Sequence, residues 1–461
     1  MEAYLLVDFG STYTKLTLVD IEKEEVAATA RAFTTVETDV MEGFDKGLAL
    51  LKEKLGHDFE VKKVSACSSA AGGLKMIALG LVPALTAEAA KRAALGAGAK
   101  VAGVYTHDLI KSEVEEILDQ APDILLLAGG TDGGNKDTVI HNARLLTEMG
   151  ISCPVVYAGN KSAIDDIEEI FKDKVEYYIT ENVMPRINEL NVEPCRETIR
   201  EIFMAKITHA KGMDGVHDRL GTISMPTPAA VLKAAQVLSE GTKTEEGLGD
   251  LVLVDIGGAT TDIHSIARGW PSNPAVSLKG LEEPFAKRTV EGDLGMRYSS
   301  RHVVEENMEM FKEYLGDDWD YSVEEELDKR TQDPGYIADS DKEKNFDSAI
   351  AKVATRLSMT RHAGFVKEVY SPIGPMFQQT GKDLIEVPAM IGTGGVLIGS
   401  EAKEEILREG FFNQEEPESL KPKGPDLYID ESYVFSAMGL LSMIDESMAV
   451  RIMKKDLKKL N

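Results

Sequence analysis

Two short segments, far apart in the chain, place an aspartate, glycines and hydroxyl residues between apolar runs. They are Leu5-Leu6-Val7-Asp8-Phe9-Gly10-Ser11-Thr12-Tyr13-Thr14-Lys15 and Leu253-Val254-Asp255-Ile256-Gly257-Gly258-Ala259-Thr260-Thr261-Asp262. In each, a tight turn between two predicted strands exposes backbone N–H groups and hydroxyls that can bind a phosphate, and the aspartate can hold a metal ion or polarise a water. Two such half-sites predict one nucleotide held between two lobes.

The glycines of these turns are suited to backbone contacts with phosphate. Gly10, Gly257 and Gly258 allow turns in which N–H groups point at phosphate oxygens. A hydrogen bond to a charged group contributes about 1.5–3 kcal/mol, so several amides together can hold a triphosphate. The sequence contains no G-x-x-x-x-G-K-[ST] pattern, and the expected phosphate site is therefore this pair of turns.

Four charged residues are candidates for the chemistry. We expect Asp8 and Asp255 to approach the β- and γ-phosphates through Mg²⁺ and its waters, because Mg²⁺ retains waters readily. Lys15 can neutralise phosphate charge, and a solvent-facing strand lysine is an equal alternative. Asp132, which follows an apolar run, is a candidate for orienting the attacking water; an aspartate that caps a glycine-rich turn is again an equal alternative.

The bulk properties of this 461-residue chain exclude several classes of protein. A net charge of −27 disfavours binding to a nucleic-acid backbone, which needs clustered Lys and Arg. The three cysteines are dispersed, without the spacing of a zinc site or a disulfide framework. No signal peptide pattern and no apolar run long enough to span a bilayer are present, so we expect a cytoplasmic protein without nucleic-acid or membrane partners.

Strand-like and helical patterns alternate along the chain, which predicts an α/β fold with a largely parallel or mixed sheet. The two phosphate segments align without gaps, and a further match supports the same register. The aligned positions are Asp8 with Asp255, Gly10 with Gly257, Thr14 with Thr261, and Ala128-Gly129-Gly130 with Thr393-Gly394-Gly395. These matches predict a divergent duplication of one lobe.

Five segments resemble, in order, the motifs of the actin, hexokinase and heat-shock-chaperone ATPase superfamily. They are Asp8–Thr12, Pro226–Ala230, Asp255–Asp262, Glu291-Gly292-Asp293-Leu294-Gly295 and Ile391-Gly392-Thr393-Gly394-Gly395. The resemblance implies two actin-like lobes with ribonuclease H-like mixed sheets and flanking helices, and ATP with Mg²⁺ in the cleft between them. Implied nucleotide contacts are Gly10, Ser11, Thr12, Lys15, Gly257, Gly258, Ala259, Thr260, Gly292, Gly394 and Gly395, with Asp8, Asp255 and Asp132 as catalytic residues.

The whole chain also resembles a narrower family, the glutamate mutase accessory proteins called MutL or GlmL. The resemblance rests on the chain length and on residues 7–15, 85–92 and 125–135. It implies an ATP-dependent reactivating chaperone for an adenosylcobalamin-dependent mutase, either glutamate mutase or a related aminomutase, from which it releases damaged cobalamin. The DNA mismatch repair proteins of the same name have a different ATPase fold. The corrinoid-binding pattern D-x-H-x-x-G is absent from this chain.

Two other functions stay open: a small-molecule kinase of the same superfamily, and an actin-like filament protein. For the domain organisation we expect four parts. These are a first ATPase lobe at 1–180 with a small insertion at about 67–118, a helical connecting segment at 181–245, a second lobe at 246–412 with an acidic helical insertion at about 300–347, and a linker with C-terminal helices at 413–461.

Overall fold

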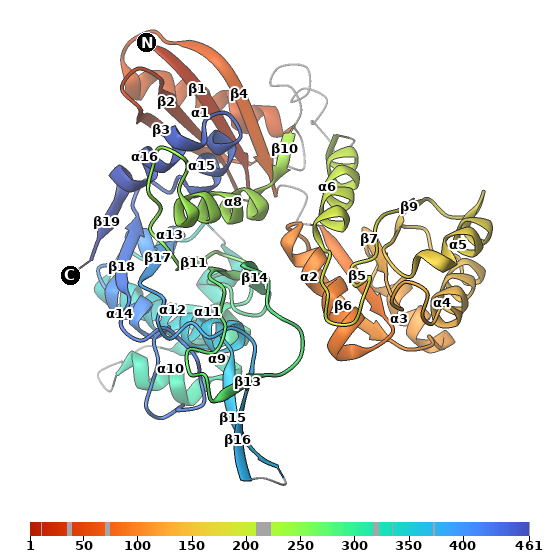
Figure 1. Ribbon diagram of the computed structural model, residues 1–461. Helices are drawn as coiled ribbons and strands as arrows, with labels where there is room; N and C mark the ends of the chain where they lie inside the picture. Colours follow the sequence, from red (N-terminus) through yellow and green to blue (C-terminus); the bar gives the residue numbers. More distant parts are fainter. Residues whose placement is uncertain are drawn as a thin grey trace. The chain divides into compact units, whose positions relative to one another are not determined.

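A computed structural model describes residues 1–10, 12–34, 39–69, 74–208, 223–316, 322–333, 335–371 and 374–460 (Figure 1). Ser11, one of the expected phosphate contacts, lies outside these residues. The chain divides into two compact units, Met1–Val231 and Leu232–Asn461. Each unit is built around mixed or parallel sheets that are flanked by helices.

The first unit contains two five-stranded sheets. Its strands are β1 (Glu2–Phe9), β2 (Tyr13–Asp20), β3 (Glu25–Phe33), β4 (Glu60–Ser68), β5 (Lys75–Gly80), β6 (Lys100–Thr106), β7 (Ile124–Leu127), β8 (Val155–Tyr157), β9 (Tyr177–Ile179) and β10 (Ile223–Pro226). Its helices are α1 (Val40–Leu55), η1 (Pro83–Ala87), α2 (Glu88–Gly96), α3 (Lys111–Asp119), α4 (Asp137–Glu148), η2 (Lys161–Ala163), α5 (Ile164–Phe171), α6 (Glu193–Thr208) and the start of α8 (Thr227–Glu240).

The first sheet has the strand order β10-β4-β1-β2-β3. β1, β2 and β3 form an antiparallel meander, and β4 and β10 continue the sheet parallel to β1. α1 begins at the N-cap Asp39 and packs on the meander, where Gly43 and Gly47 allow it to approach Phe33 and Leu16 closely. The antiparallel register places Lys15 directly opposite Asp8, next to the first phosphate turn.

The second sheet is parallel throughout and has the order β6-β5-β7-β8-β9. Its strands therefore follow the doubly wound 2-1-3-4-5 order, and its core is formed by apolar residues of the strands and of α3, α4 and α5. The sheet extends from β5 to β9, far beyond the small insertion expected at about 67–118. β10 then returns the chain to the first sheet, so the segment 181–245 is not purely helical as we expected.

The second unit contains a six-stranded and a three-stranded sheet. Its strands are β11 (Leu251–Ile256), β12 (Thr261–Ile266), β13 (Val276–Leu278), β14 (Ala286–Glu291), β15 (Phe365–Ser371), β16 (Gly374–Thr380), β17 (Ala389–Thr393), β18 (Asp426–Asp430) and β19 (Leu457–Lys459). Its helices after α8 are α9 (Ser300–Glu306), α10 (Met308–Leu315), α11 (Val323–Gln332), α12 (Asp341–His362), α13 (Gly395–Gly399), α14 (Lys403–Arg408), α15 (Phe435–Ser442) and α16 (Glu446–Asp456).

The six-stranded sheet repeats the first sheet of unit 1. Its order β14-β12-β11-β17-β18-β19 contains an antiparallel meander of β11, β12 and β14, followed by β17 and β18 parallel to β11. The strands β1, β2, β3, β4 and β10 thus correspond to β11, β12, β14, β17 and β18. The fold is α/β with two actin-like lobes built on ribonuclease H-like mixed sheets, as the sequence predicted.

One element of the predicted duplication is wrong. The sequence matched Ala128-Gly129-Gly130, after β7, with Thr393-Gly394-Gly395, after β17. β17 pairs with β11 in the sheet of the second phosphate turn, whereas β7 pairs with β5 and β8 in a different sheet from β1. The counterpart of β17 is β4, because β4 is the parallel neighbour of β1. β18 and β19 likewise extend the second sheet into the segment that we expected to be linker and helices.

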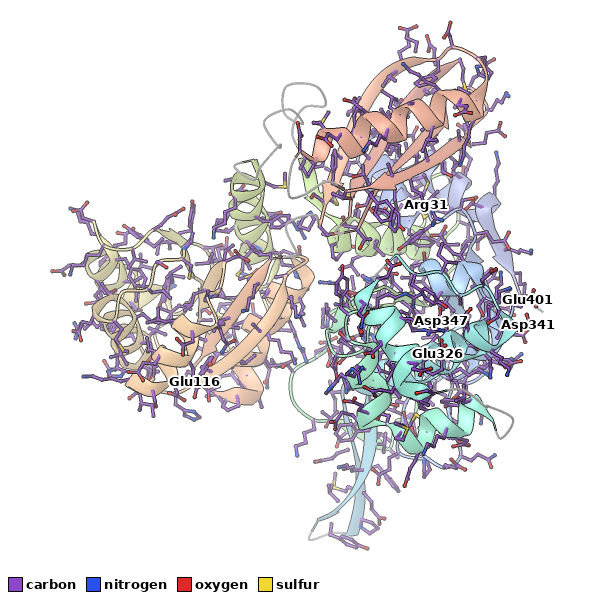
Figure 2. The ribbon with its side chains drawn as sticks, turned by 180° about the vertical axis from the view of Figure 1, so that it is seen from behind. Arg31, Glu116, Glu326, Asp341, Asp347 and Glu401 are labelled. Atoms are coloured by element: carbon purple, nitrogen blue, oxygen red, sulfur yellow. The ribbon has the colours of Figure 1, made fainter. Side chains whose placement is uncertain are left out.

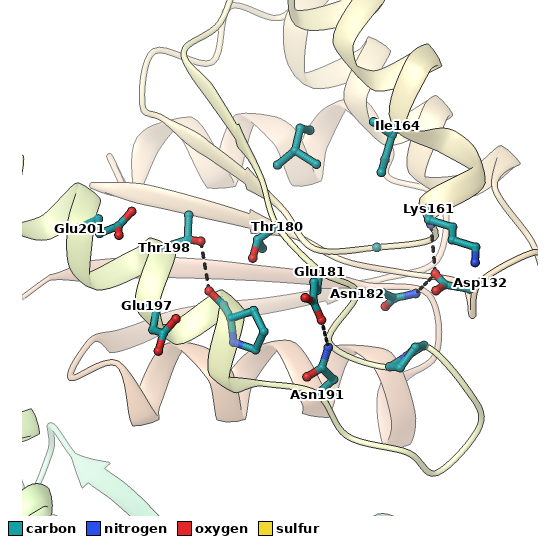
Figure 3. A pocket seen from close by; sticks show the side chains of 14 residues that line it. Asp132, Lys161, Ile164, Thr180, Glu181, Asn182, Asn191, Glu197, Thr198 and Glu201 are labelled. Atoms are coloured by element: carbon teal, nitrogen blue, oxygen red, sulfur yellow. Dashed lines mark hydrogen bonds between the residues drawn. The ribbon is translucent and has the colours of Figure 1, made fainter.

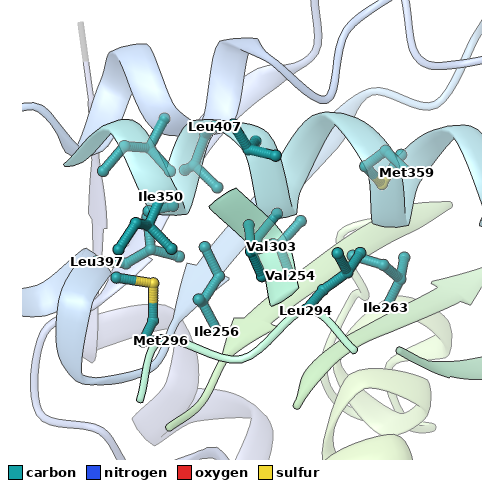
Figure 4. Packing of buried hydrophobic residues seen from close by; sticks show 14 of the residues in the cluster. Val254, Ile256, Ile263, Leu294, Met296, Val303, Ile350, Met359, Leu397 and Leu407 are labelled. Carbon is teal, nitrogen blue, oxygen red and sulfur yellow. The ribbon is translucent and has the colours of Figure 1, made fainter. Parts of the chain in front are cut away.

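The core of the second unit lies between its six-stranded sheet and α12 (Figure 4). The helix begins at Ser340, which accepts a hydrogen bond from Glu343 N while the Glu343 side chain accepts one from Ser340 N. Ile350 and Met359 on α12 pack with Val254 of β11, directly behind the second phosphate turn. Among the helices that the structure describes, none is both long and apolar enough to cross a membrane.

Candidate nucleotide-binding site

The first phosphate turn connects β1 to β2. Gly10 N donates a hydrogen bond to Tyr13 O at 3.1 Å, which closes the turn. A Cβ atom at Gly10 would lie 2.6 Å from the same oxygen, closer than any real contact, so the turn requires glycine. On the far side, Thr34 N donates to Thr12 O at 2.9 Å and ties the turn to the end of β3.

Asp8 sits beside this turn at the carboxyl end of β1 and is buried, with 3% of its side chain exposed. Thr227 Oγ1 donates to Asp8 Oδ1 at 2.6 Å, and Lys15 Nζ lies 3.6 Å from Asp8 Oδ2. Burial, and then the charge of Asp8, raise the pKa of the neighbouring Cys67 thiol well above its usual value. A carboxylate, an ammonium and a hydroxyl from three elements therefore meet at one point.

Thr227 was not among the predicted site residues. The sequence singled out the segment Pro226–Ala230 as resembling a superfamily motif but assigned no role to its hydroxyl residue. Thr227 opens α8 immediately after β10, and β10 is a parallel strand of the same sheet as β1. The carboxyl ends of parallel strands share one edge of a sheet, and a hydroxyl residue at that edge is the pattern that identifies Thr227.

The second turn connects β11 to β12 and is closed by a hydrogen bond from Gly257 N to Thr260 O at 2.9 Å. Its carbonyl groups are occupied by the segment 296–299, which follows β14. The hydrogen bonds are Met296 N to Gly257 O at 3.0 Å, Arg297 N and Tyr298 N to Gly258 O at 2.8 and 3.1 Å, and Ser299 Oγ to Ala259 O at 3.2 Å.

This arrangement orients the amides of the second turn. Within one peptide the C=O and N–H groups point in opposite directions, so carbonyls that face 296–299 turn the following N–H groups the other way. The N–H groups concerned belong to Gly258, Ala259 and Thr260, three of the predicted phosphate contacts. Several N–H groups that converge on one side of a turn form an anion-binding concavity.

Gly292, another predicted contact, belongs to the segment that supports this turn. The single hydroxyl hydrogen of Ser299 is shared between Gly292 O at 2.8 Å and Ala259 O at 3.2 Å, and Thr261 Oγ1 donates to Leu294 O at 2.5 Å. The segment after β14 is therefore joined to the turn at both of its ends. The carbonyl of Gly292 serves this support.

Asp255 lies at the end of β11 and is partly exposed. The residue opposite Asp255 in the register is Asp262, not a lysine. Asp262 is neutralised by Arg288 on β14, with Arg288 Nη2 2.6 Å and Nε 2.8 Å from Asp262 Oδ1. Thr260 Oγ1 donates to the other oxygen of Asp262 at 2.9 Å. Asp262 and Arg288 thus form a nearly buried ion pair behind the turn.

The predicted adenosine motif ends β17 next to the same turn. Gly394 has a φ of +102°, and a Cβ atom there would lie 2.4 Å from Ile256 O, so only glycine allows this approach. Gly395 opens α13 and has free space around its Cα. Thr393 Oγ1 donates to Asp430, which also caps α15 through Val434 N and which the sequence did not single out. Burial raises the pKa of Asp430 to about 6.

Asp132 belongs to the second sheet of unit 1, in the glycine-rich turn after β7, and not to the sheet of Asp8. Its Oδ1 accepts hydrogen bonds from Lys161 N at 3.1 Å and Asn182 Nδ2 at 2.9 Å, and it lines a pocket of about 650 Å³ (Figure 3). Asn160 closes the turn itself by bonding Gly133 N. Through these contacts Asp132 connects the turn after β7 to the segments of Lys161 and Asn182. Its role in orienting water stays a prediction.

The expected Mg²⁺ ion is consistent with these side chains. In proteins it is usually bound through one or two carboxylates, substrate phosphates and several waters. Asp8 and Asp255 are each the last but one residue of a strand that leads into a phosphate turn, which suits such water-mediated binding. Among the described residues, no group of three or more His, Cys, Asp or Glu side chains gathers as a metal cage.

Comparison with known proteins shows one family over nearly the full chain. The profile of a family described as "MutL protein" matches residues 4–457. A protein named "Protein MutL" from Clostridium tetanomorphum is 56% identical over 462 residues, which cover 100% of both chains.

Similar solved structures are more distant. Ligand-bound xylulose kinase from Lactobacillus acidophilus has 10% identity and a TM-score of 0.37, with 100% of this chain and 93% of that chain covered. The activator of 2-hydroxyisocaproyl-CoA dehydratase from Clostridium difficile, with bound ADPNP, has 8% identity and a TM-score of 0.30, with 100% and 99% covered.

Proposed function

This chain belongs to the MutL protein family, and on that premise we propose that it is an actin-type ATPase that reactivates an adenosylcobalamin-dependent mutase. The client is glutamate mutase or a related aminomutase, as the resemblance to the glutamate mutase accessory proteins implies. ATP and Mg²⁺ are the cofactors. The work done on the client is the release of damaged cobalamin, so that intact cofactor can enter.

The observation that carries the ATPase proposal is the second phosphate turn. Its carbonyls are bound by 296–299, and the amides of Gly258, Ala259 and Thr260 are thereby directed to the opposite side. A set of amides pointing at one position suits a polyphosphate, to which each hydrogen bond contributes about 1.5–3 kcal/mol. The first unit repeats the strand order and carries a matching turn.

An ATPase can drive such remodelling because the γ-phosphate binds one conformation better than another, and hydrolysis removes that preference. Reversing a 99:1 population takes about 5.5 kcal/mol of differential binding. A few charged hydrogen bonds from the turns to the γ-phosphate and its Mg²⁺ are of this size. We propose that Asp8 and Asp255 hold the hydrated Mg²⁺ and that Lys15 neutralises phosphate charge.

Two measurements test the proposal. The first is ATP hydrolysis by the purified chain with Mg²⁺ and no acceptor. We expect hydrolysis to be readily detected, whereas a small-molecule kinase would be nearly silent until its acceptor is added. The second is the recovery of activity when the chain, ATP, Mg²⁺ and fresh adenosylcobalamin are added to mutases inactivated with damaged cobalamin. Failure with glutamate mutase and with every aminomutase tried would refute the reactivation role.

Asp255→Asn provides the matched variant. It removes one carboxylate charge at the carboxyl end of β11, and we expect hydrolysis to fall by about 100-fold because Mg²⁺ is held less well. Asp250→Asn is the control, since Asp250 precedes the opposite end of the same strand. Equal rates in the two variants would argue against a role for Asp255 in the reaction.

A further inference from the structure

Arg297 contacts the second phosphate turn with both its backbone and its side chain. Arg297 N donates to Gly258 O at 2.8 Å. A methyl group added at Gly258 would lie 3.7 Å from Arg297 Cγ, so the stem of the arginine is in van der Waals reach of the turn. The residue is mostly buried, with 14% of its side chain exposed.

The guanidinium of Arg297 is fastened to α12 and to the loop before it. Arg297 Nη2 donates to Asp347 Oδ2 at 3.1 Å and to Tyr336 O at 2.9 Å, while Nη1 donates to Met296 O at 2.9 Å. A planar guanidinium with several partners is held in one direction, in contrast to a single ammonium on a flexible stem. The turn is therefore linked through Arg297 to the first part of α12.

Asp347 is itself held by a second arginine, on α11. Arg330 Nε donates to Asp347 Oδ1 at 2.6 Å, and Arg330 Nη1 donates to Glu326 Oε2 at 2.7 Å. Arg330 is fully buried, and its guanidinium lies 4.5 Å from the centre of the Phe346 ring. Figure 2 shows Glu326 and Asp347 close together on their two helices. Moving Asp347 would remove one of the two carboxylates that pair with this buried charge, so the cluster resists displacement.

From this chain of contacts we infer that Arg297 is a positioning residue for phosphate. Through its contacts with Asp347 and with Gly258, it fixes the turn relative to the Asp347–Arg330–Glu326 cluster. The amides of the turn therefore stay directed at one position. The inference rests on the proposed ATPase function and adds the acidic helical segment to the machinery of the site. Arg297 itself need not touch the nucleotide.

The test measures the binding of ATP and of adenosine to the full chain by calorimetry. In Arg297→Met the turn loses its link to Asp347, and we expect ATP affinity to fall about tenfold, the equivalent of one weakened charged hydrogen bond. Adenosine has no phosphates, so its affinity should change less than about twofold. Arg297→Lys keeps the charge but not the several N–H donors of the planar guanidinium, and should give an intermediate loss of ATP affinity.

Arg301→Met is the matched control. Arg301 also forms ion pairs with α11, through Glu324 and Asp328, but both carboxylates are about half or more exposed to solvent. A similar loss of ATP affinity in both variants, or an equal loss for ATP and adenosine in Arg297→Met, overturns the inference alone. A wild-type chain that binds no ATP overturns the proposed function and the inference with it. If Arg297→Met does not fold by circular dichroism, Arg297→Lys with the two ligands decides the question.

Discussion

The two phosphate turns share one backbone design but differ in how charge is arranged behind them. In unit 1 the cation is in the hairpin itself, where Lys15 lies opposite Asp8 and 3.6 Å from its carboxylate. In unit 2 the position opposite Asp255 is occupied by Asp262, whose charge is neutralised by Arg288 on the third strand. The two units share the strand order and the turn, while the charges lie on different strands of the two sheets.

The environments of the two cations differ as well. Lys15 is about a quarter exposed, and its exchange of Asp8 for phosphate is part of our proposal. Arg288 is nearly buried and bonds Asp262 with two of its nitrogens. A partly exposed ammonium suits a ligand that binds and dissociates, whereas a buried guanidinium pair supports the sheet. We expect substitutions of the two cations to separate binding from stability.

Replacing the two cations gives the largest expected difference. Arg288→Met leaves Asp262 buried without its partner, and removing one member of a buried pair costs about 3–5 kcal/mol of unfolding free energy. Lys15→Met should cost less stability, because Lys15 is about a quarter exposed, its Nζ lies 3.6 Å from Asp8, and the carboxylate keeps its hydrogen bond from Thr227. Its effect should be a weaker affinity for ATP. Urea denaturation and ATP titration of both variants measure the contrast, and equal losses of stability would remove the distinction.

Alanine at one glycine of each turn gives the next effect. A Cβ atom at Gly10 would lie 2.6 Å from Tyr13 O, so Gly10→Ala must shift the turn and should cost about 1–3 kcal/mol. Gly258 has no positive φ, and a Cβ atom there meets only the Arg297 side chain at ordinary contact distance. Gly258→Ala should therefore fold normally and keep its affinity for ATP, because the methyl group faces Arg297, on the side of the turn opposite the aligned amides. Urea denaturation and ATP titration of both variants measure the contrast.

The acid stability of the two units gives the smallest contrast. Burial lowers the pKa of His264 on β12 to about 3, and burial, followed by Lys287, lowers that of His362 on α12 well below its usual value. Below about pH 6.5 the unfolded chain binds protons that these folded histidines do not, so stability is present above that pH and is lost as the pH falls toward 3. At pH 5 the loss from His264 alone is about 2 kcal/mol.

A group of opposite sign offsets part of this loss. The raised pKa of Asp430, about 6, means that its neutral form is favoured in the folded state, which adds about 1.4 kcal/mol on going from pH 7 to pH 5. All described histidines of unit 1 are exposed. Hydrogen exchange between pH 7 and pH 4 should therefore show unit 2 opening first, and earlier opening of unit 1 would contradict the assignment.

Local patterns allowed the sequence to predict the turns and the fold class. Asp8-Phe9-Gly10 and Asp255-Ile256-Gly257 have their glycines where a strand must reverse, and each turn is closed within four residues. The strand pairings were harder to predict. β4 ends at Ser68 and its parallel partner β10 begins at Ile223, with a complete five-stranded sheet between them. Because the glycines after β7 resemble those after β17, the sequence comparison paired β17 with β7, whereas its counterpart in the sheet is β4.

The sequence by itself determined the two Asp-Gly turns, the glycines at Gly394 and Gly395, and the repetition of one lobe, because these depend on residues that are neighbours in the chain. Only the tertiary structure decided that Thr227 reaches Asp8, that Arg288 neutralises Asp262, and that Arg297 joins the second turn to Asp347. The physical reason is that side chains at the ends of parallel strands and on packed helices meet through contacts between segments far apart in the chain, and no local spacing encodes these contacts.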